Sequence, residues 1–259
     1  MAETIAVLSL KGGTGKTTTV RTLADVLRRV GLDVLAVDLD PQGNLSDYFD
    51  VPPDASPTVA DVLAGDAKVA AAAHDGIVPA TPILAEVERS LSGKMGRELV
   101  LRKALKDARK QHDVILIDCP PALGLLTING LVAADWALIS SEAQYFALQG
   151  VEGALEVIEQ AKEFYNPDLE WLGVVLNIAD MRTTHSRDAY TQLREHFGEK
   201  VFDTVIRASI AYAESAEKAR SILDHRPDLG ADYLDLADEV LGRIGLRDAR
   251  RRLEPLRTG

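Results

Sequence analysis

The 259-residue chain has little cysteine and few aromatic residues: Cys119 is its one cysteine, and Phe, Trp and Tyr make up 5% of it. One cysteine excludes a disulfide framework and a cysteine cluster that holds a metal. No apolar run reaches the roughly 18 residues of a membrane-spanning helix, and the amino terminus does not read as a signal peptide. We therefore expect a cytoplasmic protein.

Positive charge is also scarce. The chain has 29 Lys and Arg residues against 40 Asp and Glu residues, a formal net charge of −11. This balance argues against a nucleic-acid-binding protein, although a local basic face can still bind DNA. The five histidines show no metal-ligand spacing. A hydrophobic content of 46% supports a sizeable core in one large domain or two small ones.

Strand-like apolar runs alternate with helix-period segments along the chain. The runs are rich in Val, Ile and Leu, as is typical of parallel strands that are covered on both faces, and their alternation with helices predicts right-handed crossovers. We predict a single-domain α/β fold with a mostly parallel twisted sheet and helices on both faces. The predicted strands lie at residues 5–10, 34–38, 114–118, 137–141 and 172–177, and the predicted helices near 16–30, 98–111, 125–134, 148–164, 186–197 and 231–244.

Two parts of the chain are less regular. Within residues 52–93, Thr58 is expected to cap a short helix, and residues 77–84 predict a short edge strand or a loop. We assign residues 1–246 to the folded domain. Residues 247–259 carry five arginines and are expected to form a flexible basic tail.

Residues 11–18 read Lys-Gly-Gly-Thr-Gly-Lys-Thr-Thr, between an apolar run and a helical segment. A strand, a glycine-rich turn and a helix form a phosphate-binding loop, in which backbone N–H groups and the helix N-terminus hold phosphate oxygens. Lys16 would reach the β- and γ-phosphates, and the Thr17 hydroxyl would bind Mg²⁺. A second lysine, Lys11, stands where the usual motif has glycine, which suggests added charge chemistry. The predicted ATP-binding residues of the loop are Lys11, Gly12, Gly13, Thr14, Gly15, Lys16, Thr17 and Thr18.

Three aspartates follow predicted strands. Asp38 and Asp40 come at the end of the second run, and Asp118 ends the run at 114–118. Ligands of open α/β sheets bind beyond the carboxyl ends of strands, and an apolar strand that ends in Asp is typical of a Walker B segment. A lone Asp there is more often a cap or solvated, but three together indicate a magnesium–nucleotide site. The predicted metal-site residues are Thr17, Asp38 and Asp118.

The spelling of residues 11–18 resembles the deviant Walker A box of the ParA/MinD ATPases. Asp-x-Asp-Pro-Gln-Gly-Asn at 38–44 resembles switch I of ParA proteins, and residues 117–129 resemble their switch II. Residues 145–150 match a further family stretch, so the resemblance to ParA-type partition ATPases covers nearly the whole chain. It implies a P-loop NTPase fold and slow, Mg²⁺-dependent hydrolysis of ATP.

The resemblance also implies roles for single residues. Lys11 would cross a dimer interface to the nucleotide of the partner, and Asp40 would orient or activate the attacking water. Asp118 would act on Mg²⁺ from its second shell, with support from Asp38. Asn177 falls where the family reads the adenine edge, which an amide can do because it both donates and accepts. The implied catalytic set is Lys11, Lys16 and Asp40.

The family's partners follow from the same resemblance. It implies a nucleotide-dependent homodimer that binds DNA nonspecifically and is stimulated by a ParB-like protein. The chain departs from the family at residues 207–211, where a proline that frames adenine and an arginine that often contacts DNA are missing. Arg207 is expected to compensate, in the ATP site and in DNA binding. The candidate DNA-binding residues are Arg182, Arg187, Arg207, Lys218 and Arg220, for which an ordinary solvated surface is the alternative.

A MinD-like membrane-associated positioning ATPase is the alternative function. MinD-like proteins end in an amphipathic helix with bulky apolar residues, whereas this chain ends in sparse leucines interrupted by Pro255, so we expect no membrane partner. A third possibility is a nucleotide-binding regulator without significant hydrolysis, which would need inert carboxylates in its switch segments. The presence of Asp38, Asp40 and Asp118 argues against it. We expect a cytoplasmic, nucleoid-associated protein. Because the chain begins at its first strand, we also expect no DNA-binding extension before it.

Overall fold

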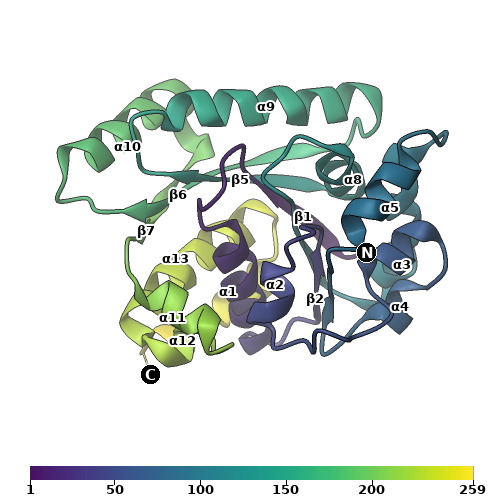
Figure 1. Ribbon diagram of the computed structural model, residues 1–259. Helices are drawn as coiled ribbons and strands as arrows, with labels where there is room; N and C mark the ends of the chain where they lie inside the picture. The colour runs from purple at the N-terminus through teal and green to yellow at the C-terminus, as the bar shows by residue number, and fades with distance from the viewer. Residues whose placement is uncertain (259) are drawn as a thin grey trace.

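The computed structural model describes residues 1–258 and shows one seven-stranded sheet with helices on both faces (Figure 1). Every pairing between neighbouring strands is parallel, and the strand order is β3-β2-β4-β1-β5-β6-β7. This confirms the predicted α/β fold. The strands are β1 (Glu3–Leu8), β2 (Val34–Asp38), β3 (Ile77–Val78), β4 (Val114–Asp118), β5 (Trp136–Glu142), β6 (Glu170–Ala179) and β7 (Val201–Arg207).

The helices form two layers. One apolar cluster joins one face of the sheet to α8 and α9, and a second joins the other face to α1 and α13 (Figure 1). The helices are α1 (Lys16–Arg29), α2 (Asn44–Tyr48), α3 (Val59–Ala64), α4 (Val69–Ala72), α5 (Leu84–Leu91), α6 (Val100–Ala104), α7 (Ala108–Gln111), α8 (Leu125–Ala133), α9 (Ala147–Phe164), α10 (Thr184–Phe197), α11 (Ala211–Glu217), α12 (Ile222–His225), α13 (Pro227–Arg243), α14 (Arg247–Arg251) and α15 (Glu254–Thr258), with 3₁₀ turns at Arg97–Leu99 and Gly198–Lys200.

In the irregular stretch 52–93 the structure has the helix capped by Thr58 and the short edge strand that the sequence predicts, and also two helices that it did not predict, α4 and α5. Thr58 caps α3 through a capping box: its hydroxyl accepts from the N–H of Ala60 at 3.3 Å, and the Asp61 carboxylate accepts from the N–H of Thr58 at 2.7 Å. Residues 77–78 form β3, a two-residue edge strand. The predicted helix at 98–111 is instead divided into α6 and α7.

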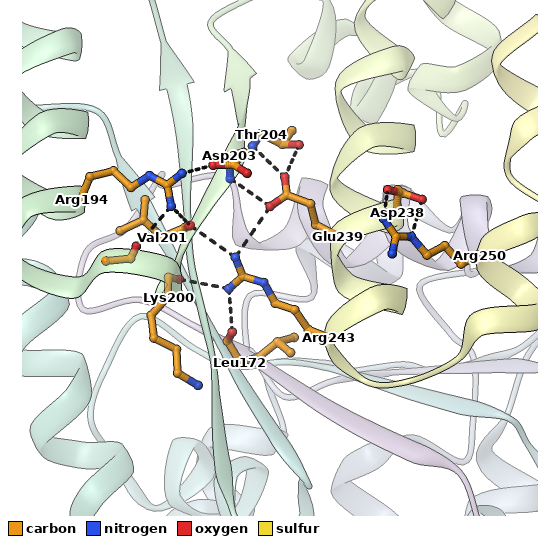
Figure 2. Close-up of polar contacts among 11 residues, drawn as sticks. Leu172, Arg194, Lys200, Val201, Asp203, Thr204, Asp238, Glu239, Arg243 and Arg250 are labelled. Carbon is orange, nitrogen blue, oxygen red and sulfur yellow. Dashed lines mark hydrogen bonds and ion pairs between the residues drawn. The ribbon is translucent and has the colours of Figure 1, made fainter.

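Polar contacts fasten α13 to the edge strand β7 (Figure 2). The Glu239 carboxylate accepts from the backbone N–H groups of Asp203 and Thr204 at 2.9 and 2.8 Å. The Arg243 guanidinium donates to the carbonyl of Leu172 at 2.9 Å and lies 3.7 Å from the centroid of the Phe202 ring. These contacts satisfy backbone groups at the edge of the sheet and fix α13 against it.

The carboxyl-terminal residues pack against α13. Leu253 is fully buried in the second cluster, and Arg250 donates twice to the Asp238 carboxylate at 2.8 Å (Figure 2). Arg257 pairs with Asp235 at 2.7 Å. The structure therefore differs from the expected flexible tail, because an apolar side chain and two acids of α13 hold the segment in place. Within residues 1–258 no helix has the length and apolar character needed to cross a membrane.

Candidate nucleotide-binding site

The glycine-rich loop joins β1 to α1 at the carboxyl edge of the sheet, with β4 and β5 on either side of β1. Gly13 and Gly15 have φ angles of +74° and +82°, a conformation that strains any other residue. A Cβ atom on Gly15 would also lie 3.2 Å from Cγ of Asn177. The loop therefore needs glycine for its conformation, and the amino end of α1 opens onto it as a phosphate site requires.

A cavity of about 690 Å³ lies over this loop. Such a volume falls within the usual range of small-molecule pockets, roughly 300–1,000 Å³. Its walls come from the loop, the segments after β2 and β4, the ends of β6 and β7, and the helices α1, α2, α11 and α13. They include Gly12, Gly13, Thr14, Gly15, Lys16, Thr17, Thr18, Asp40, Asn177, Ile178, Arg207, Tyr212 and Tyr233. The structure thus brings residues 12–18 of the predicted loop, Asp40, Asn177 and Arg207 around one cavity, whereas Lys11 is not among the residues that line it.

Thr17 and Asp118 form the polar centre of the site. The Thr17 hydroxyl donates to Oδ2 of Asp118 at 2.7 Å, while Oδ1 of Asp118 is buried and has no hydrogen-bond partner among residues 1–258. Burial, followed by the charge of neighbouring Asp38, raises the pKa of Asp118 to about 8. A buried carboxylate oxygen without a partner, next to the loop hydroxyl, is the donor set that a hydrated Mg²⁺ takes. The residues present therefore fit magnesium.

Asp38 lies opposite Asp118 on the neighbouring strand. Its carboxylate accepts three hydrogen bonds, from the N–H of Asp40 at 3.0 Å and from the N–H and hydroxyl of Ser46 at 3.0 and 2.8 Å. Burial nevertheless raises the pKa of Asp38 to about 6. These bonds make Asp38 the anchor of the loop after β2, and its part in holding a metal stays a prediction. Asp40 is half-buried and lines the cavity, where its carboxylate also accepts from the N–H of Gln42 at 3.0 Å.

The two lysines of the loop lie in different surroundings. Lys16 is buried, and within residues 1–258 its side chain has no ion pair or hydrogen bond, so its ammonium group is available to a ligand in the cavity. The Lys11 side chain is 65% exposed, and its Nζ donates to Glu142 at 3.1 Å and to Gln144 at 3.0 Å. Sequence analysis missed both partners, although Glu142 ends β5 and Gln144 follows it at the same carboxyl edge, where the rule applied to the aspartates also places ligand-binding residues.

Asn177 lies behind the loop. Its amide donates to the Ser140 hydroxyl at 2.7 Å and to the Thr19 hydroxyl at 3.4 Å, and Ser140 donates in turn to the carbonyl of Thr14 at 2.7 Å. Asn177 therefore supports the phosphate loop, and its reading of adenine stays a prediction. Its Oδ1 has no partner in the described part of the chain.

Ile178 is a site residue that sequence analysis did not find. Its φ angle is +55°, a genuine outlier for a β-branched residue, and it lies where the pairing of β6 with β7 shifts register. The side chain is 42% exposed and lines the cavity. Backbone strain at a ligand cavity is a reason to look for a functional role.

The candidate DNA-binding residues follow β6 and β7, and most already have contacts. Arg182 is paired with Asp180 at 2.8 Å, and Nε of Arg207 donates to Asp232 at 2.9 Å. Arg187 donates to two backbone carbonyls. Lys218 and Arg220 are exposed, and their side chains have no ion pair among residues 1–258. Asp180 and Asp232 therefore offset part of the positive charge of these candidate residues, and their role in DNA binding stays a prediction.

The sheet, the glycine-rich loop and the Thr17–Asp118 contact define a P-loop nucleotide-binding protein. Residues 2–171 match the family model described as an AAA domain. The chain is 41% identical over 246 residues to the chromosome-partitioning ATPase Soj of Thermus thermophilus, which covers 93% of this chain and 96% of the relative. It is 37% identical over 249 residues to the sporulation initiation inhibitor protein Soj of Bacillus subtilis, and the match covers 93% of this chain and 98% of that relative.

The similar solved structures also have the fold of nucleotide-binding proteins. Cobyrinic acid a,c-diamide synthase of Mycobacterium smegmatis, with bound ATP analogue and magnesium, is similar with a TM-score of 0.76 and 36% identity, covering 87% of this chain and 96% of that one. The septum site-determining protein MinD of Pyrococcus horikoshii, complexed with Mg-ADP, has a TM-score of 0.78 and 26% identity, covering 95% and 99%. The chain belongs to the Soj/ParA family of partition ATPases, within the ParA/MinD group of P-loop proteins.

Proposed function

We propose that this protein is a ParA-type partition ATPase: it hydrolyses ATP slowly with Mg²⁺, forms an ATP-sandwich dimer and binds DNA nonspecifically, and a ParB-like protein stimulates it. The observation that carries the ATPase part is the buried, unpartnered Oδ1 of Asp118 beside the Thr17 hydroxyl. The name of the Thermus relative, a chromosome-partitioning ATPase, supports the cellular role.

In the proposed reaction, the backbone N–H groups of the loop and the Lys16 ammonium bind the phosphates of ATP. Bound Mg²⁺ would neutralise the charge that develops on the phosphate oxygens; Thr17 and Asp118 would hold it, Asp118 through water. Asp40 accepts a hydrogen bond from the attacking water and orients its oxygen toward the γ-phosphorus. The water oxygen forms a bond to that phosphorus while the bond from the phosphorus to the bridging oxygen breaks, and the protons of the water pass to the released phosphate and to solvent, which gives ADP and inorganic phosphate.

The dimer would form across the face that carries Lys11. Next to the residues that hold Lys11 lie two exposed aromatic side chains, Tyr145 at 75% and Phe146 at 66% exposure, packed edge to face. Exposed aromatic residues are enriched at protein interfaces, so they support a second copy there. In that dimer each Lys11 would leave Glu142 and contact the nucleotide of the other protomer.

The test compares Thr17→Val with Thr17→Ser, in assays of phosphate release with Mg²⁺ and with excess chelator. The valine variant removes the hydroxyl and keeps the shape, so we expect at least about a hundredfold loss of hydrolysis, a few kcal/mol of transition-state stabilisation. The serine variant, as the matched control, should retain activity. Hydrolysis by Thr17→Val at the rate of the unaltered protein, or hydrolysis that is unaffected by the chelator, would contradict the proposal.

A MinD-like membrane function is less well supported, although the fold is shared with MinD. An amphipathic membrane helix needs a free apolar face. Here Leu253 is buried, and two arginines of α14 and α15 are paired with acids of α13. We expect ATP-dependent binding to duplex DNA and none to anionic vesicles, and the opposite result would favour the MinD-like alternative.

A further inference from the structure

A second concentration of positive charge lies away from the nucleotide cavity. Between residues 94 and 110 the chain carries seven basic and two acidic residues, although its net charge is −11. This segment forms α6 and α7 and leads into the amino end of β4, whereas the phosphate loop follows the carboxyl end of β1. The two regions therefore lie toward opposite ends of the parallel strands.

A groove of about 620 Å³ runs between α3–α4 and α6–α7. In Figure 1, α3 and α4 lie at the right, across the sheet from α11 and α12. We call this feature the lysine groove, because exposed lysines stand above buried and half-buried apolar side chains. No residue that lines it also lines the nucleotide cavity. The apolar side chains are Val62, Val69, Val100, Ala104 and Ala108, and the charged ones are Lys68, Lys103, Asp107 and Lys110.

The positive charge of the lysine groove is only partly compensated. The side chains of Lys68 and Lys103 have no ion pair or hydrogen bond within residues 1–258, whereas Lys110 is paired with Asp107 at 2.8 Å. The hydrogen bond from Lys110 lowers the pKa of Asp107, and the charges of Lys110, Lys106 and Lys68 add to this effect. Cations from two separate elements thus converge on one carboxylate.

Several arginines of the carboxyl-terminal third differ in this respect, although the side chains of Lys218 and Arg220 are also without an ion pair among residues 1–258. Arg182, Arg207 and Arg250 each have an acidic partner within 2.9 Å. Uncompensated positive charge beside apolar side chains is therefore a feature of the lysine groove. A ligand of this surface has to supply both negative charge and apolar groups.

We propose that the lysine groove binds an acidic amphipathic helix of a partner protein. Its apolar side chains would pack on the half-buried Ala67, Val100 and Ala104, and its carboxylates would meet Lys68 and Lys103, a helix-in-groove mode of recognition. Contacts with a DNA backbone need charge but no apolar surface, so the groove fits a peptide better than a nucleic acid. This interaction goes beyond the partition function, since the nucleotide cavity takes no part in it.

The experiment is fluorescence anisotropy with the full chain and a labelled helical peptide of Glu, Ala and Leu that carries its leucines on one face. A scrambled peptide of the same composition should bind at least about tenfold more weakly. Reversal of two charges, in Lys68→Glu combined with Lys103→Glu, should weaken binding about tenfold, and Val100→Gln should weaken it several-fold. Arg247→Glu combined with Arg251→Glu, which reverses two exposed charges on α14, is the matched control and should bind like the unaltered protein.

Two further measurements separate this proposal from the ATPase assignment and from other ligands. Peptide binding should be equal with ATP, with ADP and in Lys16→Gln, so loss of nucleotide chemistry leaves the result intact. Circular dichroism checks that each variant is folded. Equal binding of the ordered and scrambled peptides, or no effect of charge reversal, would overturn the proposal. So would binding of duplex DNA or phosphatidylglycerol vesicles that is lost in the double variant, because the groove would then serve that ligand.

Discussion

At the scale of single residues, Asp118 combines a stability cost with a chemical requirement. Its carboxylate is fully buried beside Asp38, and one oxygen has no partner among the described residues. A buried polar group without a partner costs about 1–3 kcal/mol. The raised pKa of Asp118 has the same cause: burial and the charge of Asp38 disfavour the ionised carboxylate, which is the form that binds magnesium.

We predict that Asp118→Asn stabilises the nucleotide-free protein and abolishes hydrolysis. Removal of a charge next to Asp38 should raise the free energy of unfolding by about 1–3 kcal/mol at pH 8. Thermal unfolding without nucleotide and phosphate release with Mg-ATP are the two measurements. Below the raised pKa the carboxyl of the unaltered protein is already neutral, so the stabilisation should shrink at pH 6. Destabilisation of the variant at pH 8 would show that Asp118 is well accommodated as a carboxylate.

Ile178 allows a test of strain at the cavity wall. Ile178→Gly should relieve the positive φ angle and raise stability by about 1 kcal/mol, while the loss of its side chain from the cavity should weaken ATP binding several-fold. Calorimetric titration and thermal unfolding measure the two effects. Ala219→Gly, which relieves a φ of +46° outside the cavity, should raise stability without changing ATP affinity. Unchanged ATP affinity in Ile178→Gly would leave the side chain without a role in binding.

At the scale of elements, the end of β5 holds the loop lysine that a dimer would need. The Lys11–Glu142 pair is mostly exposed on the lysine side, and such pairs contribute about 0–1 kcal/mol. Glu142→Gln should weaken it and lower the protein concentration for ATP-dependent dimerisation by up to about fivefold. Analytical ultracentrifugation with ATP and with ADP measures this. If Glu142→Gln needed a higher protein concentration to dimerise than the unaltered protein, Glu142 would instead be a group that stabilises the dimer.

Most elements could be predicted from the sequence because their information is local. Unbroken Val, Ile and Leu runs identified the central strands, and residues 11–18 identified the phosphate loop. The docking of α14 and α15 could not be predicted. It depends on Asp238, which pairs with α14, and on Asp235, which pairs with α15, and the sequence does not show which face of α13 these acids occupy. The contact of Glu142 with Lys11 could not be predicted either. The two residues are 131 positions apart, and they meet because β1 and β5 are neighbours in the sheet.

At the scale of the whole molecule, we expect acidic residues beside the candidate DNA-binding arginines to lower the affinity of the protein for DNA. The Arg182 side chain is 91% exposed yet paired with Asp180, whose pKa it lowers to about 2. Asp180→Asn should keep the turn and release the guanidinium, so affinity for duplex DNA with ATP should rise several-fold at low salt and fall more steeply as salt increases. Anisotropy across a salt series measures this, with unchanged basal hydrolysis expected. Asp54→Asn, an equal charge change on a loop before α3, is the control; the same gain there would point to net charge alone.

The contacts between α13 and β7 also bear on how copies of this protein can associate. An edge strand with free N–H and carbonyl groups invites another chain to add a strand. Glu239 already occupies the N–H groups of Asp203 and Thr204, and arginines occupy the carbonyls of Lys200 and Val201. The opposite edge, β3, is two residues long. Both edges of the sheet therefore offer few free backbone groups to the strand of another chain, so copies of this protein are expected to associate through side-chain surfaces and not by extending the sheet.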